Sequence, residues 1–340
     1  MVRIIIQGLG FMGRIHAQCY ASIPRAEVVG LVDLDVDRAA KVWQELGGDP
    51  IPVADSVEQV LKVVDADVVD ICLPTDAHPQ AAEIAFSAGL HVFCEKPIAL
   101  DLAAAGRITD AAAAANRELM IGHCIRFWPE YLKLKSMIDS GEAGKLLALD
   151  LFRRSPRPGY TVGDWASDPL RCQGAALDLH IHDTDFVHFL FGSPKGVFSQ
   201  GIYTPTGLDH IQTQYLFNDL VVRAEGGWSY PDKRPFQMGY CALFENGSLD
   251  CDISGSLKVR KIVGDHSQEL SGEEDTCASL SGLAGYKCQL DYFINCIAEG
   301  VPVEINTGSD ATESLRTIRA EFESVETGTP VYLAGISPSL

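Results

Sequence analysis

The stretch IIIQGLGFMGRIHAQCY, residues 4–20, decides the fold of this chain. A short apolar run, typical of a buried strand, leads into three glycines spaced G-x-G-x-x-G, and a helix-like sequence follows. The first glycine permits a tight turn, the second lets the backbone approach a pyrophosphate, and the third lets the helix pack closely on the strand. The N-terminus of that helix faces the negative charge. We therefore predict a dinucleotide-binding turn whose cofactor contacts come from Gly8, Gly10, Phe11, Met12 and Gly13.

An acidic residue follows this turn at the spacing that a dinucleotide site requires. Asp33 ends the second strand-like run, VVGLVD, twenty residues after Gly13. A carboxylate there accepts hydrogen bonds from the adenosine ribose hydroxyls and repels a 2′-phosphate, which predicts NAD as the cofactor and makes NADP the weaker candidate. Arg38 leaves one alternative open, because a guanidinium in the following helix could pair with a phosphate.

The first part of the chain has the pattern of a parallel sheet. Short β-branched runs alternate with helix-like stretches from residue 2 to about residue 123, as expected for strands joined by crossover helices. The predicted fold class is therefore α/β, with a doubly wound Rossmann domain over residues 1–123 that binds the dinucleotide.

Beyond about residue 145 the pattern changes to strand after strand, with turn residues between them. One helix-like stretch near 175–191 interrupts these strands, and two more follow near 284–299 and 308–325. We expect an α+β domain over residues 124–340, built on a large open and mainly antiparallel sheet, that serves substrate binding and oligomerisation.

The composition argues against several classes of partner. The 340 residues include 27 Lys and Arg against 46 Asp and Glu, a net charge of −19 that repels nucleic acid and anionic lipid surfaces. The sequence contains no run of about 18 apolar residues and opens without a leader-like segment, so we expect no membrane span and a cytoplasmic protein. Most of the ten cysteines lie in apolar runs and none forms a CxxC pair, which favours reduced core thiols.

Two further motifs carry polar groups at places that need an explanation. HVFCEKPIA, residues 91–99, puts Glu95 and Lys96 just after a strand-like run, at the edge of a parallel sheet where ligands bind; a surface Glu–Lys pair is the simpler alternative. GAALDLHIHDTDF, residues 174–186, places two histidines and three aspartates in an otherwise apolar helix-like stretch. Such groups require buried partners, a solvated face or a working site.

Together these motifs resemble the glucose-fructose oxidoreductase, inositol dehydrogenase and MocA (Gfo/Idh/MocA) family. The resemblance covers nearly the whole chain and rests on the glycine turn, LPTDAH at 73–78, EKP at 95–97, GHCIRFWPEY at 122–131 and LDLHIHDTDF at 177–186. It implies that Lys96 contacts the nicotinamide end and the reacting hydroxyl, that Asp178 and His182 supply the acid/base group, and that the peptide before Pro97 is cis. It also implies cofactor contacts from Leu73, Pro74, Thr75, His78, Glu95 and Lys96.

The chemistry of these side chains agrees with that assignment. Asp178 and His182 are four residues apart, so on a helix they project from one face, whereas His180 should point elsewhere. An imidazole can remove a hydroxyl proton near neutral pH while hydride leaves the same carbon. The Lys96 ammonium can stabilise the developing alkoxide. We expect substrate contacts from Lys96, Asp178 and His182 and no metal, because Thr184 and Asp185 depart from the pattern of a histidine-rich metal site.

Three more residues are candidates for substrate contacts. The resemblance places Arg126 near the cleft, although an arginine there could also be a surface charge. Tyr160 and Trp165 could line the mouth of a sugar site, or simply anchor their loop.

The resulting hypothesis is an NAD-dependent oxidoreductase that transfers hydride between nicotinamide and a secondary hydroxyl of a sugar, sugar derivative or cyclitol. A redox-neutral enzyme that cleaves glycosides through transient oxidation is the main alternative, and a non-catalytic sensor of dinucleotide or sugar is a weaker one. Apolar runs in the second domain, such as YLFNDLVV at 215–222, predict a homodimer or homotetramer built on its sheet.

Overall fold

The computed structural model describes residues 1–159, 161–254, 259–270 and 283–333. The chain divides into two compact units. The first unit comprises Met1–Cys124, Tyr160–Trp165 and Leu280–Thr312, and the second comprises Ile125–Gly159, Ala166–Ser279 and Glu313–Leu340.

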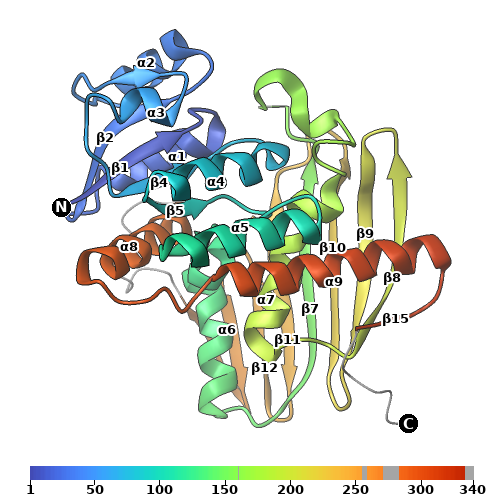
Figure 1. The fold of residues 1–340 in the computed structure, drawn as a ribbon. Helices are drawn as coiled ribbons and strands as arrows, with labels where there is room; N and C mark the ends of the chain where they lie inside the picture. Colours follow the sequence, from blue (N-terminus) through green and yellow to red (C-terminus); the bar gives the residue numbers. More distant parts are fainter. Residues whose placement is uncertain (160, 255–258, 271–282, 334–340) are drawn as a thin grey trace. The chain divides into compact units, whose positions relative to one another are not determined.

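The first unit is built on a parallel sheet of six strands in the order β3-β2-β1-β4-β5-β6 (Figure 1). Every neighbouring pair is parallel. The strand order reverses between β1 and β4, and ligands of open α/β sheets bind outside the carboxyl ends of the strands at such a reversal. The doubly wound prediction is confirmed. The strands are β1 Val2–Gln7, β2 Ala26–Val32, β3 Val53–Ala54, β4 Val68–Ile71, β5 His91–Cys94 and β6 Leu119–Ile121.

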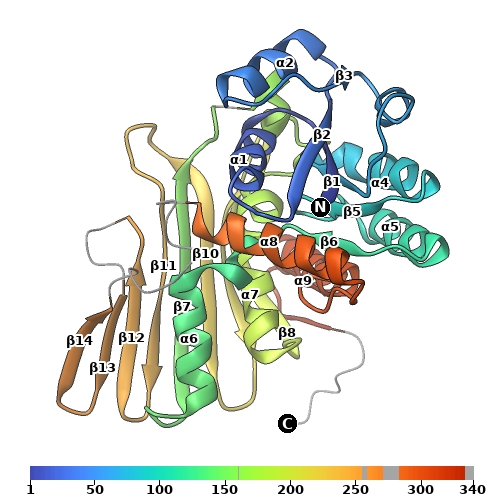
Figure 2. The same ribbon diagram turned by 90° about the vertical axis from the view of Figure 1, so that its left-hand side faces the viewer.

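Helices cover both faces of this sheet (Figure 2). On one face α1 packs against α8, and on the other α4 packs against α5. Because both faces are covered, the strands are apolar along most of their length rather than alternating. The helical elements are α1 Phe11–Tyr20, α2 Val36–Glu45, α3 Val57–Val60, η1 Thr75–Ala77, α4 His78–Ser87, α5 Leu102–Ala115 and α8 Ala284–Glu299.

The second unit is built on a sheet of nine strands in the order β14-β13-β12-β11-β7-β10-β9-β8-β15. Its neighbouring pairs are antiparallel except β7 and β10, which are parallel. The predicted mainly antiparallel sheet is confirmed. The strands are β7 Leu146–Pro156, β8 Gly196–Thr204, β9 Gly207–Leu216, β10 Val221–Tyr230, β11 Gln237–Phe244, β12 Gly247–Asp252, β13 Val259–Val263, β14 His266–Leu270 and β15 Val331–Tyr332.

Helices cover one face of this larger sheet. A π-helical turn, η4 (Ala176–His180), continues into α7 (Ile181–Phe191), and both contact strands near the middle of the sheet. The Tyr131 ring of α6 (Pro129–Ser140) packs edge-on against the Tyr240 ring of β11. The remaining long helix is α9, Gly308–Thr327. The opposite face of the sheet presents exposed apolar side chains from three neighbouring strands, namely Leu147, Val221 and Leu243.

A buried ion pair joins α7 to the sheet. The Arg153 guanidinium of β7 donates from Nε to one Asp183 oxygen at 3.0 Å and from Nη2 to the other at 2.9 Å. Both side chains are almost fully buried. A charge in such a place is tolerated only with a partner of this geometry.

The cysteines depart from expectation at one position. Eight described cysteines are free thiols, but Cys288 of α8 is disulfide-bonded. The expectation that all ten are reduced is therefore wrong, because the CxxC spacing that we considered detects only local pairs. In the described part of the chain, no helix is long and apolar enough to cross a membrane.

The Arg153–Asp183 pair yields a stability prediction. We expect Asp183→Ala to lower the free energy of unfolding by about 3–5 kcal/mol, because the change leaves a buried guanidinium without this carboxylate. Urea denaturation followed by circular dichroism measures the effect. The matched control is Asp150→Ala, which removes the exposed partner of Arg223 and should cost less than about 1 kcal/mol. Equal losses in the two variants would contradict the prediction.

Candidate active site

The glycine turn has the geometry of a phosphate cradle. Gly8 has a φ of +95°, which side chains disfavour. A Cβ added at Gly13 would lie 1.9 Å from the Gly8 carbonyl oxygen, so only glycine allows this packing of α1 on β1. A Cβ added at Gly10 would meet nothing within 4 Å. The turn is therefore tight at its base and open in front of the helix N-terminus, as a bound pyrophosphate requires.

Asp33 is held in position by this same turn. The Leu9 amide donates to one Asp33 oxygen at 2.8 Å, and the Asp35 amide donates to the other at 2.9 Å. Arg38 donates to Asp33 at 2.6 Å and to the Leu9 carbonyl at 2.7 Å. The carboxylate that would receive the ribose is thus oriented by the backbone, with the Arg38 guanidinium beside it. This arrangement fits a dinucleotide.

Two more loops leave the same edge of the sheet. Leu73, Pro74 and Thr75 follow β4, while Glu95 and Lys96 follow the neighbouring strand β5. The Lys96–Pro97 peptide is cis, which confirms that expectation.

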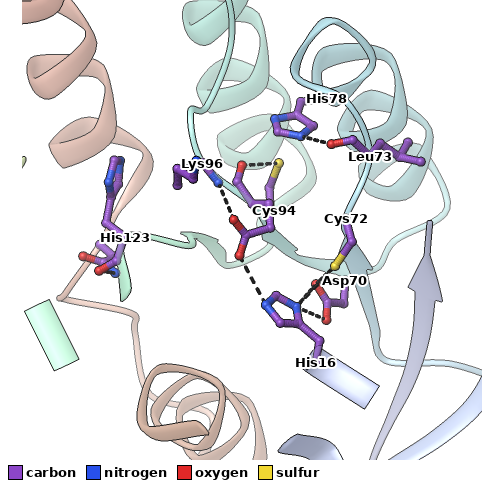
Figure 3. Close-up of polar contacts among 10 residues, drawn as sticks. His16, Asp70, Cys72, Leu73, His78, Cys94, Lys96 and His123 are labelled. Carbon is purple, nitrogen blue, oxygen red and sulfur yellow. Dashed lines mark hydrogen bonds and ion pairs between the residues drawn. The ribbon is translucent and has the colours of Figure 1, made fainter. Parts of the chain in front are cut away.

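His78 connects these two loops, and Figure 3 shows its contact with Leu73. Its Nδ1 lies 2.9 Å from the Pro97 carbonyl oxygen, and its Nε2 lies 2.9 Å from the Leu73 carbonyl oxygen. Burial lowers the pKa of His78. Only 1% of the His78 surface is exposed. The histidine therefore holds the two cofactor loops together, a structural role that the sequence interpretation did not assign to it.

Sequence reasoning missed a buried polar cluster behind the EKP turn. His16 of α1 lies against Asp70 of β4, Cys72 and Glu95. The signal was present in the run VVDICLP, because Asp70 interrupts a strand that is otherwise apolar and fully buried. A charged residue in such a strand needs a partner from elsewhere in the chain.

In the second unit, most polar side chains of the 174–186 segment are paired within the core. His180 Nε2 lies 3.1 Å from a Glu321 oxygen of α9. Thr184 lies 2.8 Å from the Tyr215 hydroxyl. Asp183 is bound by Arg153. The structure thus explains these polar groups as parts of the packing around α7.

Arg126 belongs to the same packing. Its Nε and Nη2 each donate to Asp185 at 2.8 Å, and Ser314 also donates to that carboxylate at 2.9 Å. The guanidinium lies over the Phe189 ring, 5.2 Å from its centroid. These contacts favour a structural part for Arg126 over the substrate contact that the sequence suggested.

Asp178 and His182 occupy the place where the helix changes type. Asp178 is half-buried in the π-helical turn η4, and His182 is 9% exposed in the first turn of α7. π-helical turns are rare and recur at functional sites. This local geometry agrees with a working acid/base pair.

The remaining candidates are distributed as follows. The first unit gathers the glycine turn, Asp33 and the loops carrying Leu73 and Lys96, while the second carries Asp178 and His182. Trp165 is half-buried in the short helical segment η3, Val162–Ser167. Tyr160 lies outside the described residues.

The two glycines give contrasting predictions. Gly13→Ala should destabilise the protein by about 1–3 kcal/mol, since its Cβ would overlap the backbone of the turn. Gly10→Ala should leave the melting temperature near that of the unmodified protein but weaken NAD binding, because its Cβ would occupy the open cradle. Thermal denaturation and titration with NAD measure these effects. A large loss of stability in Gly10→Ala would show that the cradle is not open.

Comparisons with known proteins agree with this geometry. Residues 2–123 match the model of the oxidoreductase family with an NAD-binding Rossmann fold, and residues 131–250 match the GFO/IDH/MocA C-terminal domain. The chain is 31% identical to UDP-N-acetylglucosamine 3-dehydrogenase of Acidithiobacillus ferrooxidans over 89% of this chain and 90% of that protein. It is 30% identical to myo-inositol 2-dehydrogenase of Thermotoga maritima over 59% of this chain and 58% of that protein. With several curated relatives, including the last, the match spans little more than half of their length.

Solved structures show the same fold. Levoglucosan dehydrogenase in complex with NADH and levoglucosan has a TM-score of 0.86 at 20% identity, over 98% of this chain and 99% of that one. An oxidoreductase from Agrobacterium radiobacter in complex with NAD+, L-tartaric acid and magnesium has a TM-score of 0.84 at 16% identity, over 97% and 98%. With both of its parts matched and its glycine turn shaped for a dinucleotide, the chain belongs to the GFO/IDH/MocA family of NAD-binding oxidoreductases.

Proposed function

We propose that this chain is a dehydrogenase that transfers hydride between NAD and a secondary hydroxyl of a sugar, sugar derivative or cyclitol. The observation that carries the proposal is the glycine turn, which is open in front of the α1 N-terminus and orients the Asp33 carboxylate for a dinucleotide. Four of the polar side chains around α7 have partners in the core of the second unit, namely His180, Asp183, Thr184 and Asp185. Asp178 and His182 have the spacing and side-chain chemistry of an acid/base pair on one helical face.

In the proposed mechanism, bound NAD supplies the hydride acceptor. The glycine turn binds the pyrophosphate, and Asp33 accepts hydrogen bonds from the ribose. The His182 imidazole takes the hydroxyl proton while Asp178 orients the ring and stabilises the imidazolium. The Lys96 ammonium holds the substrate oxygen as negative charge develops on it. Trp165 and Tyr160 contact the sugar ring in this proposal.

The names of the relatives support a sugar, sugar derivative or cyclitol as the substrate. One is a dehydrogenase of UDP-N-acetylglucosamine, others are inositol 2-dehydrogenases, and a structural neighbour is a levoglucosan dehydrogenase. All of these compounds carry secondary ring hydroxyls. A cytoplasmic location, where NAD is available to an enzyme, is part of the same proposal.

We also propose that the chain forms a homodimer or homotetramer through the face of its larger sheet that lies opposite α7. Leu147, Val221 and Leu243 are exposed there on three adjacent strands. A shallow hollow on β7–β10 adds Phe152 and Phe198 among charged and amide side chains. A mixed apolar and polar surface of this kind is typical of contacts between subunits.

The catalytic proposal predicts the behaviour of three variants. His182→Ala should lower kcat by about 10²–10⁴-fold with nearly unchanged NAD binding, because it removes the general base. Lys96→Met should be at least as severe, and Asp178→Asn should also be damaging. NADH formation with a panel of cyclitols, aldoses, sugar acids and glycosides measures these rates.

Two results would contradict this proposal. Release of the aglycone from aryl glycosides without net NADH would identify the redox-neutral glycoside-cleaving alternative. Near-normal turnover of His182→Ala on the best substrate would remove His182 from the role of base.

The assembly proposal has its own test. Light scattering should give the mass of a dimer or tetramer, and Val221→Glu combined with Leu243→Glu should shift it toward the monomer, because each buries a charge in an apolar contact. The control is Val63→Glu, which changes an exposed apolar residue of the first unit. A monomeric unmodified protein at micromolar concentration would overturn the proposal.

A further inference from the structure

An ionic cluster is buried directly behind the EKP turn in the first unit (Figure 3). His16 Nδ1 lies 2.8 Å from one Asp70 oxygen and 3.1 Å from the other, and 3.3 Å from the Cys72 sulfur. On the other side of the ring, His16 Nε2 lies 3.2 Å from Glu95 Oε1. The imidazole thus stands between two carboxylates that come from neighbouring strands.

Two neighbouring carboxylates make a charged imidazole the form that fits this position. His16 and Asp70 are both fully buried and Glu95 is 5% exposed, so two carboxylates need a positive charge nearby. Burial alone disfavours the imidazolium, but the Asp70 carboxylate outweighs it, and the pKa of His16 lies well above its usual range. Burial raises the pKa of the Cys72 thiol, which stays protonated beside the ring.

A metal ion bound by His16, Asp70 and Cys72 is the competing interpretation of the cluster. The separation of 2.8 Å between His16 Nδ1 and Asp70 Oδ2 is the length of a charge-assisted hydrogen bond. Two ligands of one tetrahedral ion, each about 2.0–2.1 Å from it, would stand farther apart. A shared proton therefore explains the contact better than an ion does.

The cluster reaches Lys96 through Glu95. The Lys96 amide donates to Glu95 Oε2 at 3.3 Å, so the same carboxylate that faces His16 also holds the backbone of the lysine. A Cβ added at Gly122 would lie 2.8 Å from Glu95 Oε1, which shows how closely the chain packs against the carboxylate there. One residue beyond Lys96, His78 contacts the Pro97 carbonyl. Both neighbours of Lys96 are thus held by buried histidines.

We propose that His16 is a positioning residue, which fixes Glu95 against Asp70 and thereby sets the backbone from which Lys96 reaches the reacting hydroxyl. His16 lies on α1, the helix whose N-terminus forms the phosphate cradle. A single buried side chain therefore ties the pyrophosphate end of the cofactor site to the lysine at its other end. The inference rests on the proposed function for the role of Lys96 in turnover, but its structural part does not.

Two variants of His16 test the contacts on the two sides of the imidazole one at a time. The amide of His16→Asn stands near Nδ1 and keeps a donor for Asp70, whereas the amide of His16→Gln stands near Nε2 and keeps a donor for Glu95. Both remove the charge, so a merely structural role would make the two variants alike. The control is His91→Asn, at the opposite end of β5, whose Nδ1 accepts from the Glu118 amide.

The first measurement is hydrogen exchange of the protein without cofactor or substrate, read by mass spectrometry. In His16→Asn, amides of a peptide spanning residues 94–101 should exchange at least about tenfold faster, because Glu95 loses its partner. In His16→Gln the increase should be smaller, because the amide keeps a donor for Glu95 although the charge is lost. A peptide of β12 in the second unit should be unchanged in both variants. Equal exchange of the 94–101 peptide in all variants overturns the proposal, whether or not the protein is a dehydrogenase.

The second measurement is turnover. His16→Asn should lower kcat by about tenfold or more with little change in the KM for NAD, His16→Gln should lower it less, and His91→Asn should stay within about threefold. If exchange responds as expected but the unmodified protein oxidises no polyol, the proposed function fails and the positioning of the EKP turn stands. If exchange of the 94–101 peptide rises in His16→Asn but kcat falls equally in His16→Asn and His16→Gln, the proposed effect of His16 on Lys96 is wrong.

A third variant keeps the test valid if substitution of His16 prevents folding. Glu95→Gln preserves the shape of the side chain and removes the charge that faces His16. It should also speed exchange of the 94–101 peptide, and combining it with His16→Gln should add little to the larger single effect, since both act on one contact. Unchanged exchange in Glu95→Gln would overturn the proposal.

Discussion

Burying a charge without a counter-charge costs several kcal/mol, and this constraint shapes both compact units of the chain. In the second unit it couples Asp183 to Arg153 and Asp185 to Arg126 in bidentate pairs, which fix α7 to its surroundings. In the first unit it draws Asp70 and Glu95 to the single imidazole of His16. The high density of acidic groups in the 174–186 segment is therefore largely a property of the core, and the proposed chemistry rests on only two residues of it.

The sequence predicts those features that depend on local geometry. The glycine spacing and the position of Asp33 follow from the steric demands of one strand–turn–helix unit, and the structure shows the tight turn and the oriented carboxylate. The alternation of strands and helices likewise indicates that helices cover both faces of the first sheet. The change to consecutive strands after residue 145 predicts a large, open and mainly antiparallel sheet, and that sheet is present.

Features that depend on distant pairing could not be predicted in this way. Arg126 and Asp185 are 59 positions apart, and His16 and Asp70 are 54 apart. Nothing in the local pattern of Arg126 distinguishes a substrate contact from the partner of a buried aspartate. The parallel pairing of β7 with β10 inside a mainly antiparallel sheet depends on the whole topology as well. Family membership follows from motifs, whereas the substrate depends on pocket shape, which no short motif encodes.

The π-helical turn between Ala176 and His180 limits how this segment can change over evolutionary time. Such a turn contains one residue more than the α-helical turn it replaces. Each residue of an α-helix rotates the chain by about 100°, so deleting one residue here would swing the aspartates of α7 away from their arginines. Substitutions at a single position disturb one contact, but a change of length disturbs all of them together. Natural variation in this segment should therefore consist of replacements, with insertions and deletions displaced to the loops on either side.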